Sequence, residues 1–179
     1  EMTQKLAALM QEIQPDLLIV PGDVNSTLSA AIAANKLGIP VAHLESGLRS
    51  FDRSMSEEIN RILVDEITQE YLVTEQSGLD HLRAEGKDEK RIHFVGNTMI
   101  DTLVAFDEQI EQSAVLEEHQ LEKKNFALLT MHRPSNVDSK EGLQFIIDLI
   151  RAVSADQNVI FPIHPRSKNK FENFGMWDE

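Results

Sequence analysis

Residues 16–45 read DLLIVPGDVNSTLSAAIAANKLGIPVAHLE and contain two short apolar runs on either side of an alanine-rich segment. The two runs, residues 16–22 and 39–45, have the length and composition of buried strands. The segment between them, residues 27–37, has the length and composition of a helix. The stretch therefore predicts a strand, a crossover helix and a second strand parallel to the first.

Polar and glycine residues mark both ends of the predicted helix. Asn25 and Ser26 are candidate N-caps, and Gly38 followed by Pro40 closes the helix. The same alternation continues along the chain and predicts helices over 2–13, 57–68, 76–85 and 141–153, a helix near Lys168, and strands over 70–74, 91–97, 126–132 and 158–164. This order predicts an α/β fold with parallel sheets.

A polar and acidic run, DEQIEQSAVLEEHQLEKKN, interrupts this pattern at residues 107–125. A solvated helix and a linker explain the run better than an interaction tail, which would need a denser block of charge. We predict the C-terminal portion of a first Rossmann-like domain over 1–110 and an inter-domain linker region over 111–124. The N-terminal portion of a second Rossmann-like domain follows over 125–179.

The bulk composition excludes several classes of protein. The formal net charge of −13, from 30 acidic and 17 basic residues, opposes the phosphate neutralisation that nucleic-acid binding requires, so no nucleic-acid partner is expected. No apolar run approaches the roughly 18 residues that span a bilayer, and no secretory signal pattern precedes the first helix. There is no cysteine for a disulfide framework. We therefore expect a cytoplasmic protein with no membrane partner.

Ionisable residues follow the first two predicted strands, where ligands of open parallel sheets bind. Asp23 lies in the turn PGDVNST, where it could face a ligand or serve as a turn or capping residue. Glu45 and Arg49 lie in HLESGLRS after the second strand. His43 alternates with Glu45, which predicts that both point to one face. A buried His43 bonded to the backbone is the simpler explanation for that residue, whereas Glu45 is harder to explain by structure alone.

A second acidic group opens the predicted helix at 57–68. Glu57, Asn60 and Arg61 are spaced i, i+3 and i+4, so they share one helix face. Such a set could orient a carboxylate for proton transfer or form an ordinary helix ion pair, and the spacing favours neither. Ser56 could cap this helix, and Glu58 or Glu57 could simply favour its positive end.

Two basic pairs end the predicted strands of the second domain. His132 with Arg133, and His164 with Arg166, would form a local basic patch in an acidic protein. Arginine offers a planar fork of donors and histidine can add a further donor, so the patch suits a diphosphate. No two histidines have zinc-like spacing with a third ligand, and we assign no metal and no cofactor.

Three stretches together resemble the non-hydrolysing UDP-N-acetylglucosamine 2-epimerases: GDVNSTLSAAIAANKLGIPVAHLESGLRSFDRSMSEEINRILVD, FVGNTMIDTL and TMHRPSNVD. The resemblance implies a GT-B type fold of two Rossmann-like parallel-sheet domains, both incomplete here, so the chain is expected to be a middle fragment of the full-length enzyme. Ser56 stands where the family commonly has proline, and Ser135 stands where a glutamate usually follows the His-Arg pair.

The resemblance also implies a reaction and roles for residues. UDP-N-acetylglucosamine and UDP-N-acetylmannosamine would be interconverted by elimination and re-addition of UDP with exchange of the C2 proton. The implied catalytic residues are Asp23, Glu45, Glu57 and His132. The implied substrate-binding residues are Arg49, Asn60, Arg61, Arg133 and His164.

Further expectations follow from the family. The full-length enzyme would be a cytoplasmic homodimer that serves cell-surface polysaccharide biosynthesis. Three alternatives stay open: the hydrolysing relative that releases UDP and N-acetylmannosamine, a non-catalytic sugar-nucleotide-binding fragment, and a retaining GT-B glycosyltransferase.

Overall fold

The computed structural model describes residues 1–177, which form two compact units. Unit 1 is Glu1–Asp107, and unit 2 begins at Glu108. Among the described residues, no helix combines the length and the apolarity needed to cross a membrane. The division into domains at 1–110 and 125–179 with a linker between them stays a prediction.

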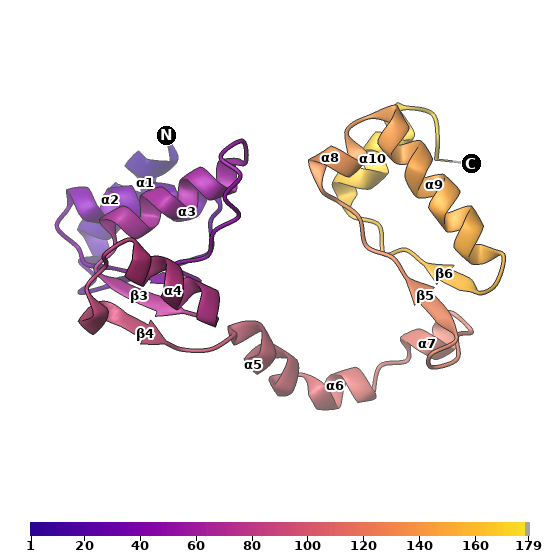
Figure 1. Cartoon of the computed structure of the whole chain (residues 1–179), viewed down its shortest axis with the longest axis horizontal. Helices are drawn as coiled ribbons and strands as arrows, with labels where there is room; N and C mark the ends of the chain where they lie inside the picture. Colours follow the sequence, from indigo (N-terminus) through magenta and orange to yellow (C-terminus); the bar gives the residue numbers. More distant parts are fainter. Residues whose placement is uncertain (178–179) are drawn as a thin grey trace. The chain divides into compact units, whose positions relative to one another are not determined.

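Unit 1 is a parallel four-stranded sheet with helical connections (Figure 1). The strand order is β1-β2-β3-β4, and every neighbouring pair is parallel. The α/β class and the predicted order of elements are therefore confirmed. The elements are α1 (Met2–Ile13), β1 (Leu18–Pro21), α2 (Asn25–Lys36), β2 (Val41–Leu44), α3 (Ser56–Ile67), β3 (Glu70–Val73), α4 (Gln76–Ala84), the 3-10 helix η1 (Glu89–Arg91), β4 (Ile92–Phe94) and α5 (Thr98–Ala105).

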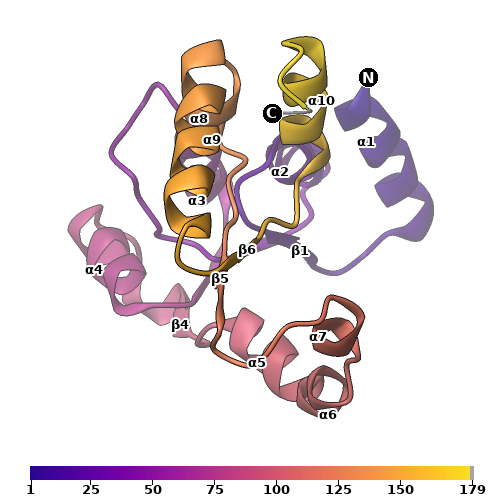
Figure 2. The ribbon, with the colours of Figure 1, turned by 90° about the vertical axis from the view of Figure 1, so that its right-hand side faces the viewer.

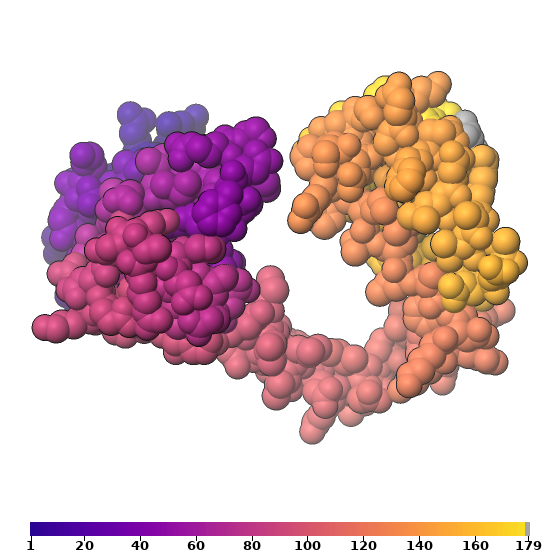
Figure 3. All heavy atoms as spheres, in the orientation of Figure 1, coloured from indigo at the N-terminus to yellow at the C-terminus, as the bar shows by residue number. Residues whose placement is uncertain are grey.

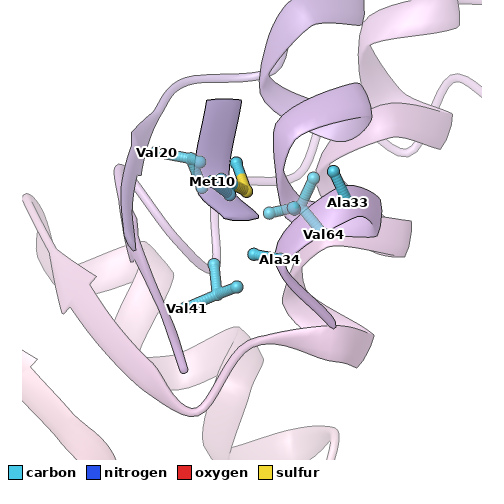
Figure 4. Packing of buried hydrophobic residues seen from close by; sticks show 7 residues of the cluster. Met10, Val20, Ala33, Ala34, Val41 and Val64 are labelled. Atoms are coloured by element: carbon cyan, nitrogen blue, oxygen red, sulfur yellow. The ribbon is translucent and has the colours of Figure 1, made fainter. Parts of the chain in front are cut away.

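The main core of unit 1 lies between the first two strands and the helices α1 to α3. Val20 and Val41 point from the strands toward Met10 and Val64 on the helices (Figure 4). Small side chains on α2 let this helix pack closely, and those buried in the cluster are Ala31, Ala33 and Ala34. Figure 3 shows the atoms of this unit packed as one continuous body. The alternation of side chains leaves Ile19, on the opposite face of β1, 57% exposed.

The predicted cap of α2 is wrong. The helix begins at Asn25, so its N-cap is Val24, and no side chain caps it. The Asn25 side chain instead accepts a hydrogen bond from Asn60 of α3 at 3.0 Å. The cap of α3 also differs, because Met55 is the N-cap and Ser56 is already the first helical residue. Its hydroxyl donates to the Glu57 carboxylate, and the helix has no side-chain cap at this end.

Gly47 lies in the loop after β2, where two segments of backbone approach closely. It has φ +80°, and a Cβ there would lie 2.3 Å from the carbonyl oxygen of Gly78 at the start of α4. A Cβ on Gly78 would in turn lie 2.9 Å from the carbonyl oxygen of Ser46. Both glycines are therefore required for this loop to lie against α4.

Unit 2 contains a two-stranded parallel sheet, and Figure 2 shows its strands side by side. Leu143, Ile146 and Ile147 of its longest helix form a buried cluster with Phe171. Its elements are α6 (Asp107–Glu111, whose first residue belongs to unit 1), α7 (Val115–Glu118), β5 (Phe126–Leu128), α8 (Pro134–Val137), α9 (Lys140–Ser154), β6 (Asn158–Ile160) and α10 (Pro165–Asn173). Neither α6 nor α7 has a buried residue, as expected of the acidic run.

The strands predicted over 126–132 and 158–164 are shorter in the structure. The ladder pairs only three residues of each strand, from Phe126 with Asn158 to Leu128 with Ile160. The N–H of Leu129 still donates to the carbonyl of Ile160 at 2.9 Å. The apolar residues after this last bond, Met131, Phe161 and Ile163, pack on the α9 and α10 cluster instead. An apolar run alone does not distinguish a strand from an extended segment buried under helices.

The Gly47 contact predicts a specific loss of stability. Gly47→Ala is expected to lower the free energy of unfolding by about 2–5 kcal/mol, because it adds a left-handed backbone penalty and a clash. Gly38→Ala is the matched control, since Gly38 has φ +72° but no atom within 4 Å of a new Cβ. It should cost only about 1–2 kcal/mol. Urea unfolding measures the free energy of unfolding of the two variants. Equal losses would show that the close approach of Gly47 to Gly78 adds nothing to the cost.

Candidate active site

The turn after β1 carries Asp23 at the carboxyl end of the sheet. Gly22 has φ +62°, and its N–H donates to the carbonyl of Leu44 in the next strand at 3.0 Å. The Thr27 hydroxyl of α2 donates back to the carbonyl of Pro21 at 2.7 Å. These two hydrogen bonds fix the turn on both sides of Asp23, whose side chain remains 31% exposed.

The first turns of α3 face this turn. The Asn60 amide donates to the carbonyl of Asp23 at 2.8 Å and to Asn25 at 3.0 Å. The Arg61 guanidinium forms an ion pair with the Asp23 carboxylate, and its other terminal nitrogen lies 3.4 Å from Glu58. The structure thus brings Asp23, Asn60 and Arg61 together, and the guanidinium supplies a counter-charge to two carboxylates.

Glu45 begins the loop after β2 and has φ 71°, a left-handed conformation that is uncommon for a residue other than glycine. Its N–H donates to the carbonyl of Leu72 in β3 at 3.0 Å. A carboxylate oxygen of Glu45 lies 3.9 Å from the position that a Cβ on Gly22 would occupy. The carboxylate therefore lies beside the turn that carries Asp23. The expected alternation with His43 stops at Leu44, because the strand ends there.

Glu57 lies in the first turn of α3 and is exposed to solvent. The pKa of Glu57 lies below its ordinary value because its carboxylate interacts with its own backbone N–H and accepts a hydrogen bond from the Ser56 hydroxyl. The Arg61 charge lowers that pKa further. Glu57 is therefore ionised near neutral pH and able to accept a proton.

Glu58 has a structural role that the sequence did not single out. It is 1% exposed, and its carboxylate accepts hydrogen bonds from the Ser50 N–H at 2.9 Å, the Ser50 hydroxyl at 3.0 Å and the Phe51 N–H at 3.0 Å. Burial alone would raise the pKa of Glu58, but these donors and Arg61 outweigh it and lower that pKa. Glu58 thus anchors the long loop between β2 and α3, whereas its neighbour Glu57 is exposed to solvent.

His43 is fully buried, and one ring nitrogen lies 2.9 Å from the carbonyl oxygen of Gly22, which confirms the predicted backbone contact. The other ring nitrogen lies 2.6 Å from Asp65 of α3. Asp65 also pairs with Arg49 at 2.7 Å. The buried guanidinium of Arg49 requires a counter-charge, but the sequence pattern does not indicate that Asp65 supplies it.

The Arg49 side chain is 3% exposed. Besides Asp65, it donates to the carboxylate of Glu85 at 2.7 and 2.9 Å and to the carbonyl of Leu48 at 2.8 Å. The substrate-binding role implied for Arg49 therefore stays a prediction, and the geometry favours a role in holding the loop after β2.

In unit 2, the two predicted histidines meet. The rings of His132 and His164 stack with centroids 5.4 Å apart. His164 caps α10 by accepting the N–H of Arg166 on its Nδ1 at 3.1 Å, so its other ring nitrogen carries the proton. Arg133 is the exposed N-cap of α8. Arg166 is engaged in an ion pair with Asp138, so it contributes less to the predicted basic patch.

Chemically, unit 1 offers carboxylates for proton transfer, and unit 2 offers two imidazoles and a guanidinium for an anion. Within residues 1–177, no group of three or more histidine, aspartate or glutamate side chains could hold a metal ion.

Comparison with known proteins connects these features to one family. The sequence profile of the UDP-N-acetylglucosamine 2-epimerase family matches residues 1–177. A UDP-N-acetylglucosamine 2-epimerase of Methanocaldococcus jannaschii is 37% identical over 100% of this chain and 51% of its own length. A UDP-N-acetylglucosamine 2-epimerase homolog of Methanococcus maripaludis is 38% identical over 100% of this chain and 50% of its own length.

Solved structures agree with the sequence comparison. The crystal structure of the Methanocaldococcus jannaschii UDP-GlcNAc 2-epimerase in complex with UDP-GlcNAc and UDP is similar with a TM-score of 0.86 and 37% identity, over 99% of this chain and 50% of that one. The enzyme from Rickettsia bellii is similar with a TM-score of 0.83 and 32% identity, over 96% of this chain and 45% of that one. These neighbours confirm the predicted GT-B type fold.

The chain spans about half the length of the curated relatives it matches. The resemblance inferred from the motifs is confirmed by the profile, the relatives and the fold together. The chain belongs to the UDP-N-acetylglucosamine 2-epimerase family.

Proposed function

We propose that the protein containing this chain interconverts UDP-N-acetylglucosamine and UDP-N-acetylmannosamine. The observation that carries the proposal is the grouping of carboxylates at one edge of the unit 1 sheet. Asp23 follows β1, Glu45 follows β2 beside it, and Glu57 opens the helix whose Arg61 pairs with Asp23. The relative from Methanocaldococcus jannaschii, crystallised with UDP-GlcNAc and UDP, supports this choice of ligand.

The chemistry explains why several carboxylates are needed. The C2–H of the sugar is weakly acidic, so a carboxylate must remove the proton as the C1–O bond to UDP breaks. The C–H electron pair then forms a C1–C2 double bond, and UDP leaves with the electrons of the C1–O bond. A proton returns to C2 from the other face, and UDP adds back at C1. Removal and return on opposite faces require acid/base groups at two positions.

The leaving diphosphate needs positive charge and hydrogen-bond donors. We assign this role to His132, His164 and Arg133 of unit 2, with Asn60 and Arg61 as further binding residues. Stabilising the departing UDP lowers the barrier to elimination, because the charge on its oxygen develops as the C1–O bond breaks. The proposal includes no metal and no cofactor.

The hydrolysing reaction is the second candidate, since it passes through the same elimination and the same carboxylates could serve it. A non-catalytic sugar-nucleotide-binding role is the third. We further propose that the longer protein is a cytoplasmic homodimer, with domains over 1–110 and 125–179 and a linker over 111–124.

The first test is C2 deuterium exchange in heavy water, followed by mass spectrometry of UDP-N-acetylglucosamine. It should be run on this chain and on a chimera extended at both ends with the flanking segments of the Methanocaldococcus jannaschii relative. The chimera is expected to incorporate deuterium while UDP stays attached at equilibrium. Free N-acetylmannosamine would indicate the hydrolysing reaction. UDP binding without any exchange would contradict the enzyme and favour the binding protein.

Adjacent glutamates provide a matched pair of variants in that chimera. Glu57→Gln should lower the exchange rate by about 100- to 10,000-fold, as expected for loss of a general base, and change stability by less than about 0.5 kcal/mol. Glu58→Gln should cost about 1–3 kcal/mol of stability, because its new amide group faces the N–H donors of Ser50 or Phe51. Kinetics and urea unfolding of both variants check this, and full activity of Glu57→Gln would exclude its catalytic role.

A further inference from the structure

Asp65 lies beneath both loops that carry candidate catalytic carboxylates, although it is not one of them. It is fully buried on α3. Its carboxylate lies 2.6 Å from the Nδ1 of His43 and 2.7 Å from Arg49, and it accepts the N–H of Gly47 at 3.1 Å. A buried charge persists only when partners of this kind surround it.

His43 extends the contact to the turn after β1. Its Nε2 lies 2.9 Å from the carbonyl oxygen of Gly22, while its Nδ1 faces Asp65. Both ring nitrogens face oxygen acceptors, so the ring satisfies both contacts only when each nitrogen carries a proton. The cluster thus places His43 and Arg49 against two carboxylates, Asp65 and Glu85.

The ionisation of Asp65 fits this arrangement. Burial alone would raise the pKa of Asp65, but the hydrogen bond and charge of His43, together with the Arg49 guanidinium, outweigh burial and leave that pKa below its ordinary value. The carboxylate is therefore ionised near neutral pH and contacts both His43 and Arg49.

The cluster reaches both catalytic candidates through the backbone. Gly22 immediately precedes Asp23, and Gly47 and Arg49 closely follow Glu45. Glu45 has a left-handed φ of 71°, and such strain persists only where the surrounding structure fixes it.

We propose that Asp65 is a positioning residue that sets the placement of Asp23 and Glu45 relative to each other, through His43 on one side and through Gly47 and Arg49 on the other. The contacts of Asp65 with His43, Gly47 and Arg49 support the structural part of this proposal. Its catalytic consequence rests on the proposed function, because Asp23 and Glu45 must act on the same carbon of the sugar.

Asp65→Asn tests the link, with Glu66→Gln as the matched control. Asparagine has the size of aspartate but replaces one acceptor oxygen with an NH2 group that faces the donors. Glu66 is the next residue of α3, and its carboxylate pairs with Lys87 at 2.8 Å near the surface, so its variant removes a charge from the same helix without touching the cluster.

The readout is hydrogen–deuterium exchange of the backbone amides in the 179-residue chain. The amides to follow are those of Gly22 and Glu45, which donate to Leu44 and Leu72 and not to Asp65. Both should exchange at least about tenfold faster in Asp65→Asn, since ordered loops open more often once their anchor is lost. Glu66→Gln should leave both unchanged. Changes confined to α3, or no change, would overturn the proposal.

A second variant keeps the test decisive if Asp65→Asn does not fold. His43→Asn retains a donor at the position of Nδ1, facing Asp65, but cannot reach the Gly22 carbonyl. The Gly22 amide should then exchange faster while the Gly47 amide stays protected. Unchanged protection at Gly22 would show that His43 does not connect Asp65 to the turn, and the proposal would fail.

The catalytic consequence is measured in the extended chimera. Asp65→Asn should lower kcat for C2 exchange by about 100-fold, the cost of displacing catalytic groups by about 1 Å, with little change in KM. A full rate in Asp65→Asn would refute the positioning role. If the unsubstituted chimera shows no C2 exchange, the proposed function fails, while the amide-exchange result still decides the structural link.

Discussion

The buried contacts of Asp65 with His43 and Arg49 are the constraint on which the strand-end loops of unit 1 depend. Each buried ion loses several kcal/mol of hydration, and this loss is offset only by close contacts with good geometry. His43, Arg49 and the Gly47 amide provide these contacts from the β2 strand and the loop that follows. A displacement of that loop would leave charges buried without partners, so the cluster restricts the loop to one arrangement.

One face of α3 carries the residues that enforce this arrangement. Glu58, Arg61 and Asp65 are spaced by three and four residues, which places them in a row on the helix. Glu58 anchors the loop at Ser50, and Arg61 pairs with Asp23. Asp65 contacts His43 and Arg49. Proton transfer requires reacting groups held in a defined geometry, and a helix provides a more rigid support than a loop.

Periodicity and turn signals predicted the order of the main helices and strands, and the helix over 2–13 has the predicted bounds. The burial of His43 was also predictable, since it lies within an apolar strand. The roles of Glu58 and Asp65 were not. An acidic residue on a helix has the same local pattern whether it faces solvent or a buried cation, and the partners of Asp65 lie 16 to 22 residues away in the sequence. The strand ends of unit 2 were predicted too far along the chain for a related reason, because apolar residues such as Met131 and Ile163 pack on helices beyond the last paired residues.

The proposed division of roles between the units also separates two chemical outcomes. Unit 1 carboxylates would govern whether the C2 proton leaves and returns, and this step is common to the epimerising and hydrolysing reactions. The outcome diverges afterwards, when either UDP or water adds to C1 of the unsaturated intermediate. Under the proposed function, exclusion of water around that carbon would determine whether UDP is retained, and the basic residues of unit 2 would favour retention by binding the diphosphate. Deuterium at C2 thus reports on the carboxylates, whereas free sugar reports on the containment of the intermediate.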